Sequence, residues 1–237
     1  MSTLEKTSVS SLDEWMRRLP ETWAYDALFR LIFVAWFLFV EYHAATGLVA
    51  YVGSRGGNPD AVFVANVCAR VALMAFLATL MVCVILRSRP VGKARGLAPR
   101  LTAFAGSYLM LVLPFFPSSE MSLGASIVSA TLMFLGNGLS VYVLFWLGRS
   151  LSIMAEARKL VTTGPYALVR HPLYVAEELA VLGLFIQFAS AWAAVLLAVH
   201  IALQFQRMRY EESVLHDAFP EYGDYARHTR RLIPGIY

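Results

Sequence analysis

The segment Lys159-Leu-Val-Thr-Thr-Gly-Pro-Tyr-Ala-Leu-Val-Arg-His-Pro-Leu-Tyr174 separates two long apolar runs and determines how the C-terminal half of the chain folds. Pro165 and Pro172 each lack a backbone donor and disfavour helix at the residue before them. We therefore predict an ordered loop that ends at a helix start, with Pro172 in the first helical turn. A loop rich in Arg, His and Tyr beside a membrane has two interpretations. It is a basic connector with interfacial tyrosines, or it is a functional loop.

The composition of the chain excludes an ordinary soluble domain. Of 237 residues, 58% are hydrophobic and only 15% are charged, and the mean hydropathy is +0.59. Apolar runs of about 20 residues recur, each long enough to cross a hydrocarbon core of about 30 Å as a helix. The sequence therefore predicts an all-α, polytopic membrane helix bundle whose first partner is the lipid bilayer. Because the basic residues flank the apolar runs, topology accounts for the net charge of +4, and we expect no nucleic-acid partner.

Six transmembrane helices are expected, followed by a polar C-terminal segment that begins with a helix. The expected spans are residues 27–51, 61–86, 101–116, 123–147, 174–188 and 191–208. The last two predict a tight helical hairpin that turns near Ser190. Gly136-Asn-Gly138 lies in the middle of the fourth span, where small residues permit close helix approach or a kink.

The distribution of basic residues predicts the topology. Of the 20 Lys and Arg residues, 18 fall on one side of these spans, leaving Arg55 opposite and Arg70 within a span. By the positive-inside rule, both termini and the Lys159–Tyr174 loop are cytosolic, in a membrane of the bacterial inner-membrane type.

The chain divides into three expected parts. Residues 1–26 form a polar segment without signal-peptide character, with an interfacial amphipathic helix around Leu12, Trp15, Met16 and Leu19. Residues 27–146 form variable transmembrane helices, and residues 147–237 form a core with a loop, a helical hairpin and a C-terminal segment. The sequence carries no signal for an oligomeric state.

Ionisable groups inside the spans need partners. An arginine within hydrocarbon is costly, so Arg70 should face a partner or a water-filled cavity. Antiparallel packing of the first two spans sets Glu41 and Arg70 at similar depth, and we predict that they pair. The five histidines show no metal-ligand spacing, so no metal site is expected, and His200 is interpreted as a hydrogen-bonded packing group. Glu177 and Glu178 lie just inside the fifth span, with either a structural or a direct substrate role.

A second polar segment, Arg207–Phe219, follows the sixth span. Arg207 and Glu211 lie four residues apart on one helical face, which is typical of a solvated helix with an intrahelical ion pair. Because the last two spans form a hairpin, this segment and the Lys159–Tyr174 loop should emerge side by side. Arginines, a histidine, tyrosines and a carboxylate then converge beside an apolar slot, as expected where a polar cofactor meets a lipophilic acceptor. The sequence has neither a dinucleotide-binding Gly motif nor a Walker phosphate loop.

Several of these motifs together resemble one family. They are Leu160-Val-Thr-Thr-Gly-Pro-Tyr166, Val169-Arg-His-Pro-Leu-Tyr174, Glu211-Glu212 and Phe219-Pro-Glu-Tyr222, then Tyr225 and Ile233-Pro234. The combination resembles the isoprenylcysteine carboxyl methyltransferase family, integral membrane enzymes of the wider phospholipid-methyltransferase group. The resemblance runs from about Leu147 to the C-terminus and implies S-adenosyl-L-methionine as cofactor, bound in a cytosolic pocket.

The resemblance also implies roles for individual residues. Arg158, Lys159, Leu160 and Val161 match a strip that holds the methyl donor largely through backbone groups. Gly164, Tyr166, His171, Pro172, Leu173 and Tyr174 match the next wall of the donor pocket. Glu211 matches an acidic cofactor contact, and Arg207 matches the arginine assigned to the acceptor. Many relatives carry His in place of Arg158 and Gly in place of Ala176.

The chemistry that follows is in-line methyl transfer to a lipophilic or membrane-associated acceptor, which mainly requires positioning and exclusion of water. Glu211 is expected to bind cationic or hydroxyl groups of the donor. Arg170 or Arg207 is expected to hold a carboxylate acceptor, which needs no general base. An amine or alcohol acceptor needs one, and His171 or Glu178 is then the candidate. The expected catalytic set is therefore Arg207, Arg170 and His171.

Two other functions compete with carboxylate O-methylation by a membrane methyltransferase. A sterol-reductase-like oxidoreductase shares a similar C-terminal architecture but binds NADPH. A non-catalytic membrane protein of the same fold would bind neither cofactor.

Overall fold

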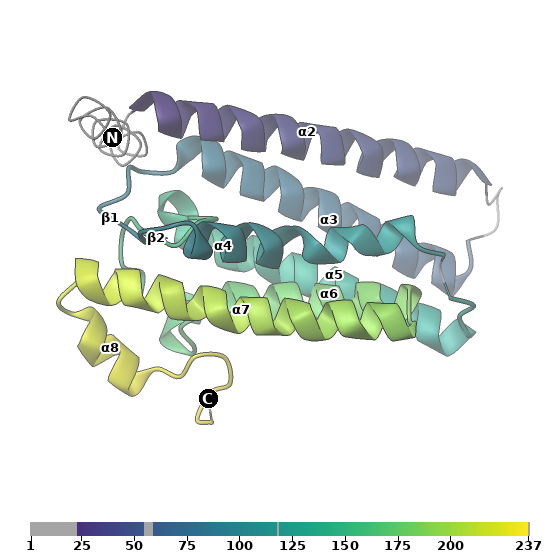
Figure 1. Cartoon of the computed structure of the whole chain (residues 1–237). Coiled ribbons are helices and arrows are strands. Elements are labelled where there is room, and N and C mark those ends of the chain that lie inside the picture. Colours follow the sequence, from purple (N-terminus) through teal and green to yellow (C-terminus); the bar gives the residue numbers. More distant parts are fainter. Residues whose placement is uncertain (1–22, 55–58, 118, 237) are drawn as a thin grey trace, which may run out of the picture.

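The computed structural model describes residues 23–54, 59–117 and 119–236, and within them the chain is a bundle of helices (Figure 1). The long helices are α2 (Trp23–Ser54), α3 (Ala61–Leu86), α5 (Leu123–Leu147), α6 (Pro172–Gln187) and α7 (Ala191–Ala218). Shorter are α4 (Ala98–Tyr108), which continues as the 3-10 helix η2 (Leu109–Phe115), and α8 (Tyr222–His228). The all-α prediction is confirmed. The amphipathic helix predicted around Leu12–Leu19 lies outside the described residues.

Four of the described helices are long and apolar enough to cross a membrane, as expected of an integral membrane protein. They are Asp26–Ser54, Ala61–Leu86, Leu123–Ser150 and Ala191–Ala218. The other two predicted spans are shorter as helices. Residues 101–116 divide between α4 and η2, whose Pro114 lies inside the 3-10 helix, and α6 has 16 residues. Six helical segments lie side by side, but six crossings stay a prediction.

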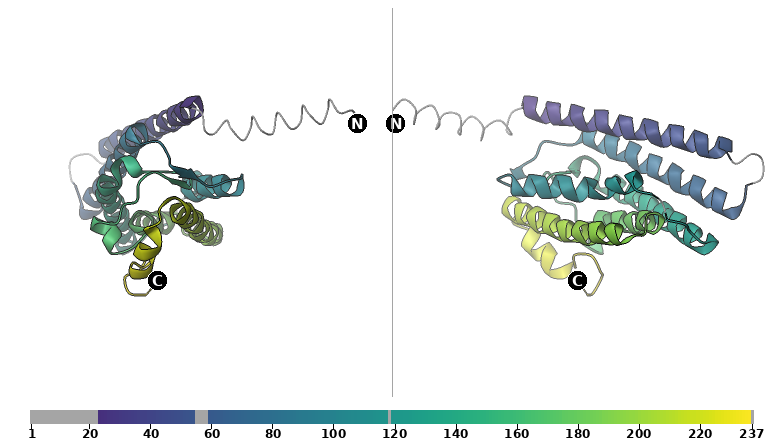
Figure 2. Two further views of the ribbon diagram at one scale, coloured as in Figure 1. Left: turned by 90° about the vertical axis from the view of Figure 1, so that its left-hand side faces the viewer. Right: turned by 45° about the vertical axis from the view of Figure 1, so that its right-hand side comes forward.

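The helices pack in an open ring rather than a closed bundle. Helix α2 packs on α3, α3 on α5 and α5 on α6, whereas α4 packs on α7. Seen along the bundle, α2, α3, α5 and α6 form a curved row, and α4 and α7 face it (Figure 2). Ser190 caps α7 by accepting from the Ala193 amide, so the hairpin turns where the sequence predicted, although α6 packs mainly on α5 rather than on α7.

Two glycines let α5 and α6 approach each other closely. A Cβ at Gly136 of α5 would lie 2.4 Å from the Ala180 amide nitrogen, and one at Gly183 of α6 would lie 2.7 Å from the Ser129 carbonyl oxygen. The Ser129 hydroxyl also donates to the Gly183 carbonyl at 2.8 Å. The close approach predicted for Gly136-Asn-Gly138 is therefore confirmed at Gly136, while Gly138 faces open space.

The predicted Glu41–Arg70 ion pair is wrong. The Arg70 guanidinium lies 4.9 Å from the centre of the Tyr51 ring, and Glu41 Oε2 is buried without a hydrogen-bond partner among the described residues. A Cβ at Gly47 would lie 3.7 Å from Arg70 Nη1, so the guanidinium lies beside Gly47 and Tyr51, nearer the C-terminal end of α2 than Glu41. The Arg70 side chain therefore extends away from Glu41, and its positive charge is attracted by the face of the Tyr51 ring.

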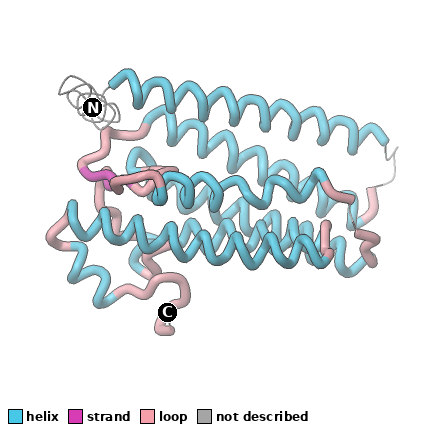
Figure 3. The backbone as a smooth tube through the Cα atoms, in the orientation of Figure 1, coloured by secondary structure: helices cyan, strands magenta, loops and turns pink. Residues whose placement is uncertain are grey.

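At the opposite end of the bundle, the connector after α3 forms a small ribbon with the segment after α5 (Figure 3). Strands β1 (Gly92–Lys93) and β2 (Glu156–Ala157) pair antiparallel, and the ribbon packs through Ala155 and Ala157 against Val214 of α7. We call this the basic end, because basic residues gather there. Arg30 lies near the start of α2, Arg87 follows the end of α3, and the Lys159–Tyr174 loop lies beside them. The ribbon was not predicted.

The glycine contacts give a matched test of the α5–α6 packing. We expect Gly136→Ala to destabilise the protein by about 1 to 3 kcal/mol, since its Cβ would meet backbone atoms of α6. Gly138→Ala on the same helix should be neutral or stabilising by up to about 1 kcal/mol, because alanine favours helix over glycine. Thermal unfolding in detergent measures the difference. Equal midpoints for the two variants would contradict the close packing.

Candidate active site

One cavity of about 360 Å³ lies inside the ring of helices. Its volume is in the range of small-molecule sites. Its walls come from two chemically different sets of residues. At the basic end they are Lys159, Tyr166, Tyr174, Glu211, Tyr222 and Tyr225, and further into the bundle they are Trp36, Phe37, Val40, Leu73, Phe76 and Leu80. The cavity therefore joins a polar end to an apolar end.

Most of the residues predicted for the site line this cavity. They are Arg158, Lys159, Leu160, Val161, Tyr166, Arg170, His171, Leu173, Tyr174, Arg207 and Glu211. Gly164 and Pro172 do not. Gly164 has a positive φ of 61° and packs under the Trp146 ring, where a Cβ would lie 2.4 Å from a ring carbon. Pro172 begins α6, as predicted, and is buried. Both shape the loop without reaching the cavity.

The loop is held in place by an ion cluster around Glu212, which we call the Glu212 cluster. Glu212 Oε1 accepts from Arg170 Nε at 2.9 Å and lies 3.1 Å from His171 Nε2, while Oε2 accepts from Arg231 Nη2 at 2.6 Å. The carboxylate comes from α7, the arginine–histidine pair from the loop, and Arg231 from the C-terminal segment. All three segments are therefore joined at one group.

Backbone hydrogen bonds reinforce the same junction. The amides of Arg170 and His171 donate to the carbonyls of Arg230 and Arg231 at 2.7 and 3.0 Å. Arg170 Nη1 also donates to the carbonyls of Ala226, at 2.8 Å, and Thr229. The predicted proximity of the loop and the segment after α7 is confirmed. Arg170 and His171 make most of their hydrogen bonds within this junction. These contacts favour a role in positioning the loop over a direct role in catalysis for both residues.

Tyr174 lies between the two predicted α7 residues. Its hydroxyl donates to Glu211 Oε2 at 2.9 Å, and the Arg207 guanidinium carbon lies 5.0 Å from the centre of its ring. Arg207 Nη1 also donates to Gln204 Oε1 at 2.9 Å. Arg207 and Glu211 thus flank one buried ring instead of forming the intrahelical ion pair that a solvated helix would show. Both side chains are directed into the bundle.

Two tyrosines of the C-terminal segment complete the polar end, and the predicted site set did not include them. The Tyr225 hydroxyl donates to the Tyr166 carbonyl at 2.6 Å, and burial raises the pKa of Tyr225 to about 12, so the hydroxyl stays protonated and remains a donor. Tyr222 lines the cavity, and its hydroxyl is buried without a partner in the described part of the chain. The signals in the sequence were the Phe219-Pro-Glu-Tyr222 motif for Tyr222 and the separate match at Tyr225.

The two acids of α6 have different surroundings. Glu178 Oε1 lies 2.9 Å from His200 Nε2, so His200 is hydrogen-bonded as the sequence predicted, although it also lines the cavity. Glu177 lines the cavity together with Gln204 and Arg207. Of the two glutamates, Glu177 is therefore the one that lines the cavity, whereas Glu178 was the predicted candidate base.

The apolar end of the cavity lies beside a seam between α2 and α4. The rings of Trp36 and Tyr108 meet edge to face across it, with centroids 6.1 Å apart, and both residues line the cavity. Trp36 is 42% exposed.

The remaining predicted chemistry concerns metals. Within the described ranges, no group of three or more His, Cys, Asp or Glu side chains is arranged to hold a metal ion.

Comparison with known proteins finds a family model that matches part of the chain. The family model described as phospholipid methyltransferase matches residues 125–222, which extend from α5 to the first residue of α8, and this confirms the resemblance seen in the sequence. The chain is 44% identical over 78 residues to the cobalt-zinc-cadmium resistance protein CzcN of Cupriavidus metallidurans. It is 40% identical over 82 residues to the nickel-cobalt-cadmium resistance protein NccN of Alcaligenes xylosoxydans xylosoxydans. These matches cover 32% and 34% of this chain and 36% and 38% of the relatives, respectively.

The Glu212 cluster predicts a large effect of one neutral substitution. We expect Glu212→Gln to destabilise the protein by about 3 kcal/mol, because it leaves Arg170 and Arg231 without their carboxylate in a largely buried site. Hydrogen exchange of the Arg170 and His171 amides should also become faster. Asp217→Asn, an exposed acid on the same helix, is the control. Thermal unfolding and exchange rates that are equal in the two variants would contradict the role of the cluster.

Proposed function

Because residues 125–222 match the phospholipid methyltransferase family, we propose that this chain is an integral membrane methyltransferase that uses S-adenosyl-L-methionine. Its acceptor is lipophilic or membrane-associated, and a carboxylate is the preferred acceptor group. The observation that carries the proposal is the single cavity that joins a polar end, suited to the donor, to an apolar end between α2, α3 and α4.

The polar end fits the groups of the donor. The segment Arg158–Val161 lines the cavity and offers main-chain donors and acceptors, and the Glu211 carboxylate accepts from cationic or hydroxyl groups. The buried Tyr222 hydroxyl, which has no partner among the described residues, is a further group for a ligand to satisfy. When bound, S-adenosyl-L-methionine supplies a methyl group on a positively charged sulfur.

Arg207 is the residue we propose to hold the acceptor. Its guanidinium is fixed by Gln204 and by the Tyr174 ring, on the cavity wall between the polar and apolar ends. A planar guanidinium can bind a carboxylate through two parallel hydrogen bonds, which would orient one oxygen towards the methyl group. A carboxylate needs no general base. For an amine or alcohol acceptor, Glu177 is the acid that faces the cavity and would take the proton.

The apolar part of the acceptor would lie along Trp36, Phe76 and Leu80. We propose that it enters from the bilayer at the seam between α2 and α4, where the Trp36 and Tyr108 rings meet in an edge contact. Water is kept from the reaction by the apolar walls on one side and by the ordered loop and C-terminal segment on the other. We propose further that the basic end faces the cytosol of a bacterial-type cell, following the positive-inside rule.

Ligand binding and methyl transfer test the proposed function. We expect the purified protein to bind S-adenosylhomocysteine and not NADPH, and to transfer labelled methyl from S-adenosylmethionine into membrane extracts. A base-labile product bond would indicate an ester. Binding of NADPH alone would indicate an oxidoreductase, and binding of neither would indicate a non-catalytic protein. Because the two relatives are named as metal resistance proteins, growth with cobalt, nickel, zinc or cadmium is a second readout in cells.

Two substitutions in α7 distinguish the functions proposed for the two ends of the cavity. We expect Glu211→Gln to raise the KM for S-adenosylmethionine at least about tenfold, since a hydrogen bond to a charged group is lost. Arg207→Lys should instead lower kcat/KM for the acceptor about tenfold or more, because the two-pronged contact is lost.

Arg209→Lys is the control for both substitutions, since Arg209 is exposed two residues beyond Arg207 on the same helix. It should leave both constants within about twofold of the unchanged protein. The assignment of Glu211 to the donor and Arg207 to the acceptor is contradicted if the two variants change the same constant.

A further inference from the structure

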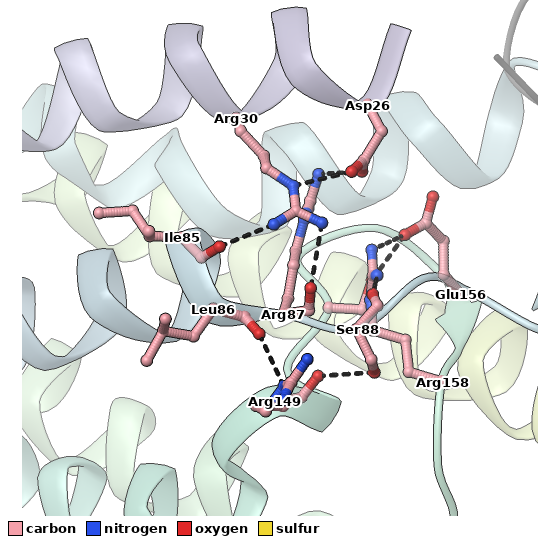
Figure 4. A network of polar contacts seen from close by, with 10 residues as sticks. Asp26, Arg30, Ile85, Leu86, Arg87, Ser88, Arg149, Glu156 and Arg158 are labelled. Carbon is pink, nitrogen blue, oxygen red and sulfur yellow. Dashed lines mark hydrogen bonds and ion pairs between the residues drawn. The ribbon is translucent and has the colours of Figure 1, made fainter. Parts of the chain in front are cut away.

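Next to the segment Arg158–Val161 lies a network of charged groups (Figure 4). Of its members, Asp26, Arg30 and Arg87 do not line the cavity, whereas Glu156 does. It joins the beginning of α2, the end of α3 and the ribbon at the basic end. None of its members from α2 and α3 is in the part of the chain that matches the methyltransferase family, which begins at residue 125. Through this network, helices outside the matched residues are connected to the segment proposed to bind the donor.

The Arg158 side chain belongs to this network and not to the cavity. Arg158 Nη2 donates to Glu156 Oε2 at 2.5 Å, and Nη1 donates to the Ser88 carbonyl. The Arg158 side chain is 0% exposed, whereas the whole residue is 6% exposed. The small exposed surface of Arg158 is therefore that of its main chain. The guanidinium presents no accessible surface to a molecule in the cavity.

The ribbon fixes where the segment Arg158–Val161 begins. The Val91 amide donates to the Ala157 carbonyl at 2.7 Å, and the Ala94 amide donates to the Ala155 carbonyl at 2.9 Å. Arg158 follows immediately after β2, at the point where the regular pairing ends. Its bond to the Ser88 carbonyl continues the attachment to the connector by one more step.

The other half of the network anchors that connector. Arg87 Nη2 donates to Asp26 Oδ1 at 2.7 Å, and Arg30 Nε donates to Asp26 Oδ2 at 2.7 Å. Arg30 also donates to the carbonyls of Ile85, at 2.7 Å, and Arg87, at 3.0 Å, at the C-terminal end of α3. A cation at these carbonyls is favourable because they have no partner within the helix. The start of α2 thus holds the end of α3, from which the connector runs to Ser88.

We propose that Arg158 is a positioning residue for the methyl donor: its buried guanidinium, held by Glu156, fixes the main chain of residues 158–161 against the connector after α3. It sets donor affinity without touching the donor. This inference rests on the proposed function, because it concerns the donor site of that reaction. The alternative is a direct ion pair between Arg158 and the carboxylate of the donor, and the two can be separated by experiment.

The experiment compares two ligands on three variants. Binding of S-adenosylhomocysteine, and of an analogue that lacks its carboxylate, is measured by calorimetry for Arg158→Lys, Glu156→Gln and the exposed control Arg209→Lys. We expect Arg158→Lys to weaken binding of both ligands by the same factor of about ten, because lysine cannot bond both Ser88 and Glu156 in the fixed fork geometry. Glu156→Gln should weaken both ligands by a smaller common factor, and Arg209→Lys should weaken neither.

Turnover gives a second readout that a merely structural defect would not produce. With saturating S-adenosylmethionine, kcat of Arg158→Lys should stay within about twofold of the unchanged protein, and only the KM for the donor should rise. Thermal unfolding checks that the variant is folded. If Arg158→Lys does not fold, Glu156→Gln, which keeps the arginine, carries the comparison.

Each outcome decides between the interpretations. A penalty that disappears for the analogue without a carboxylate means that Arg158 contacts the donor, and it overturns the inference. Unchanged binding of both ligands in Arg158→Lys and Glu156→Gln also overturns it, while leaving the proposed function intact. Failure of the unchanged protein to bind S-adenosylhomocysteine overturns the proposed function itself, and the inference with it.

Discussion

The architecture of the basic end depends on one carboxylate. Glu212 is the only acid that contacts the loop, α7 and the C-terminal segment together in the described structure, and it does so through Arg170, His171 and Arg231. A buried carboxylate surrounded by two guanidinium groups and a ring nitrogen is stable only while all of them stay in place. The three segments are therefore fixed relative to one another, and the polar wall of the cavity has a defined shape before any ligand binds.

The two ends of the cavity are held by different forces. At the basic end, ion pairs, a two-stranded ribbon and backbone hydrogen bonds satisfy polar groups that would be costly to bury alone. At the apolar end, the walls are side chains of α2, α3 and α4, and the Trp36–Tyr108 contact is a weak edge-to-face pair that can separate at low cost. The proposed methyl transfer to a lipophilic acceptor requires both properties. The polar groups must be held rigidly in alignment, and the acceptor must be able to enter through a weak seam towards the bilayer.

The sequence predicted what depends on local pattern. Apolar run lengths predicted the long helices, Pro172 predicted the start of α6, and the hairpin at Ser190 correctly brought Arg207 and Glu211 beside the loop. The sequence did not predict the ribbon, because two-residue strands of Gly, Lys, Glu and Ala carry no periodic signal. The Glu41–Arg70 pair failed because depth alone does not fix which way a long side chain turns. Ser88 lies 70 residues from Arg158, and Tyr108 lies 72 residues from Trp36, so no local signal in the sequence could predict these two contacts. The division of the chain at residues 26 and 146 stays a prediction.

The extent of the family match bears on what the acceptor is. The matched residues 125–222 contribute the loop, Glu211, Tyr222 and Arg207, which form the proposed donor end and the proposed acceptor contact. The apolar walls formed by Trp36, Phe76 and Tyr108 come from helices outside the match. If the donor chemistry is common to proteins that share this segment, the acceptor is selected by helices that they need not share. The family match therefore informs the kind of reaction more than the substrate, and the substrate must be sought through the shape of the apolar end of the cavity.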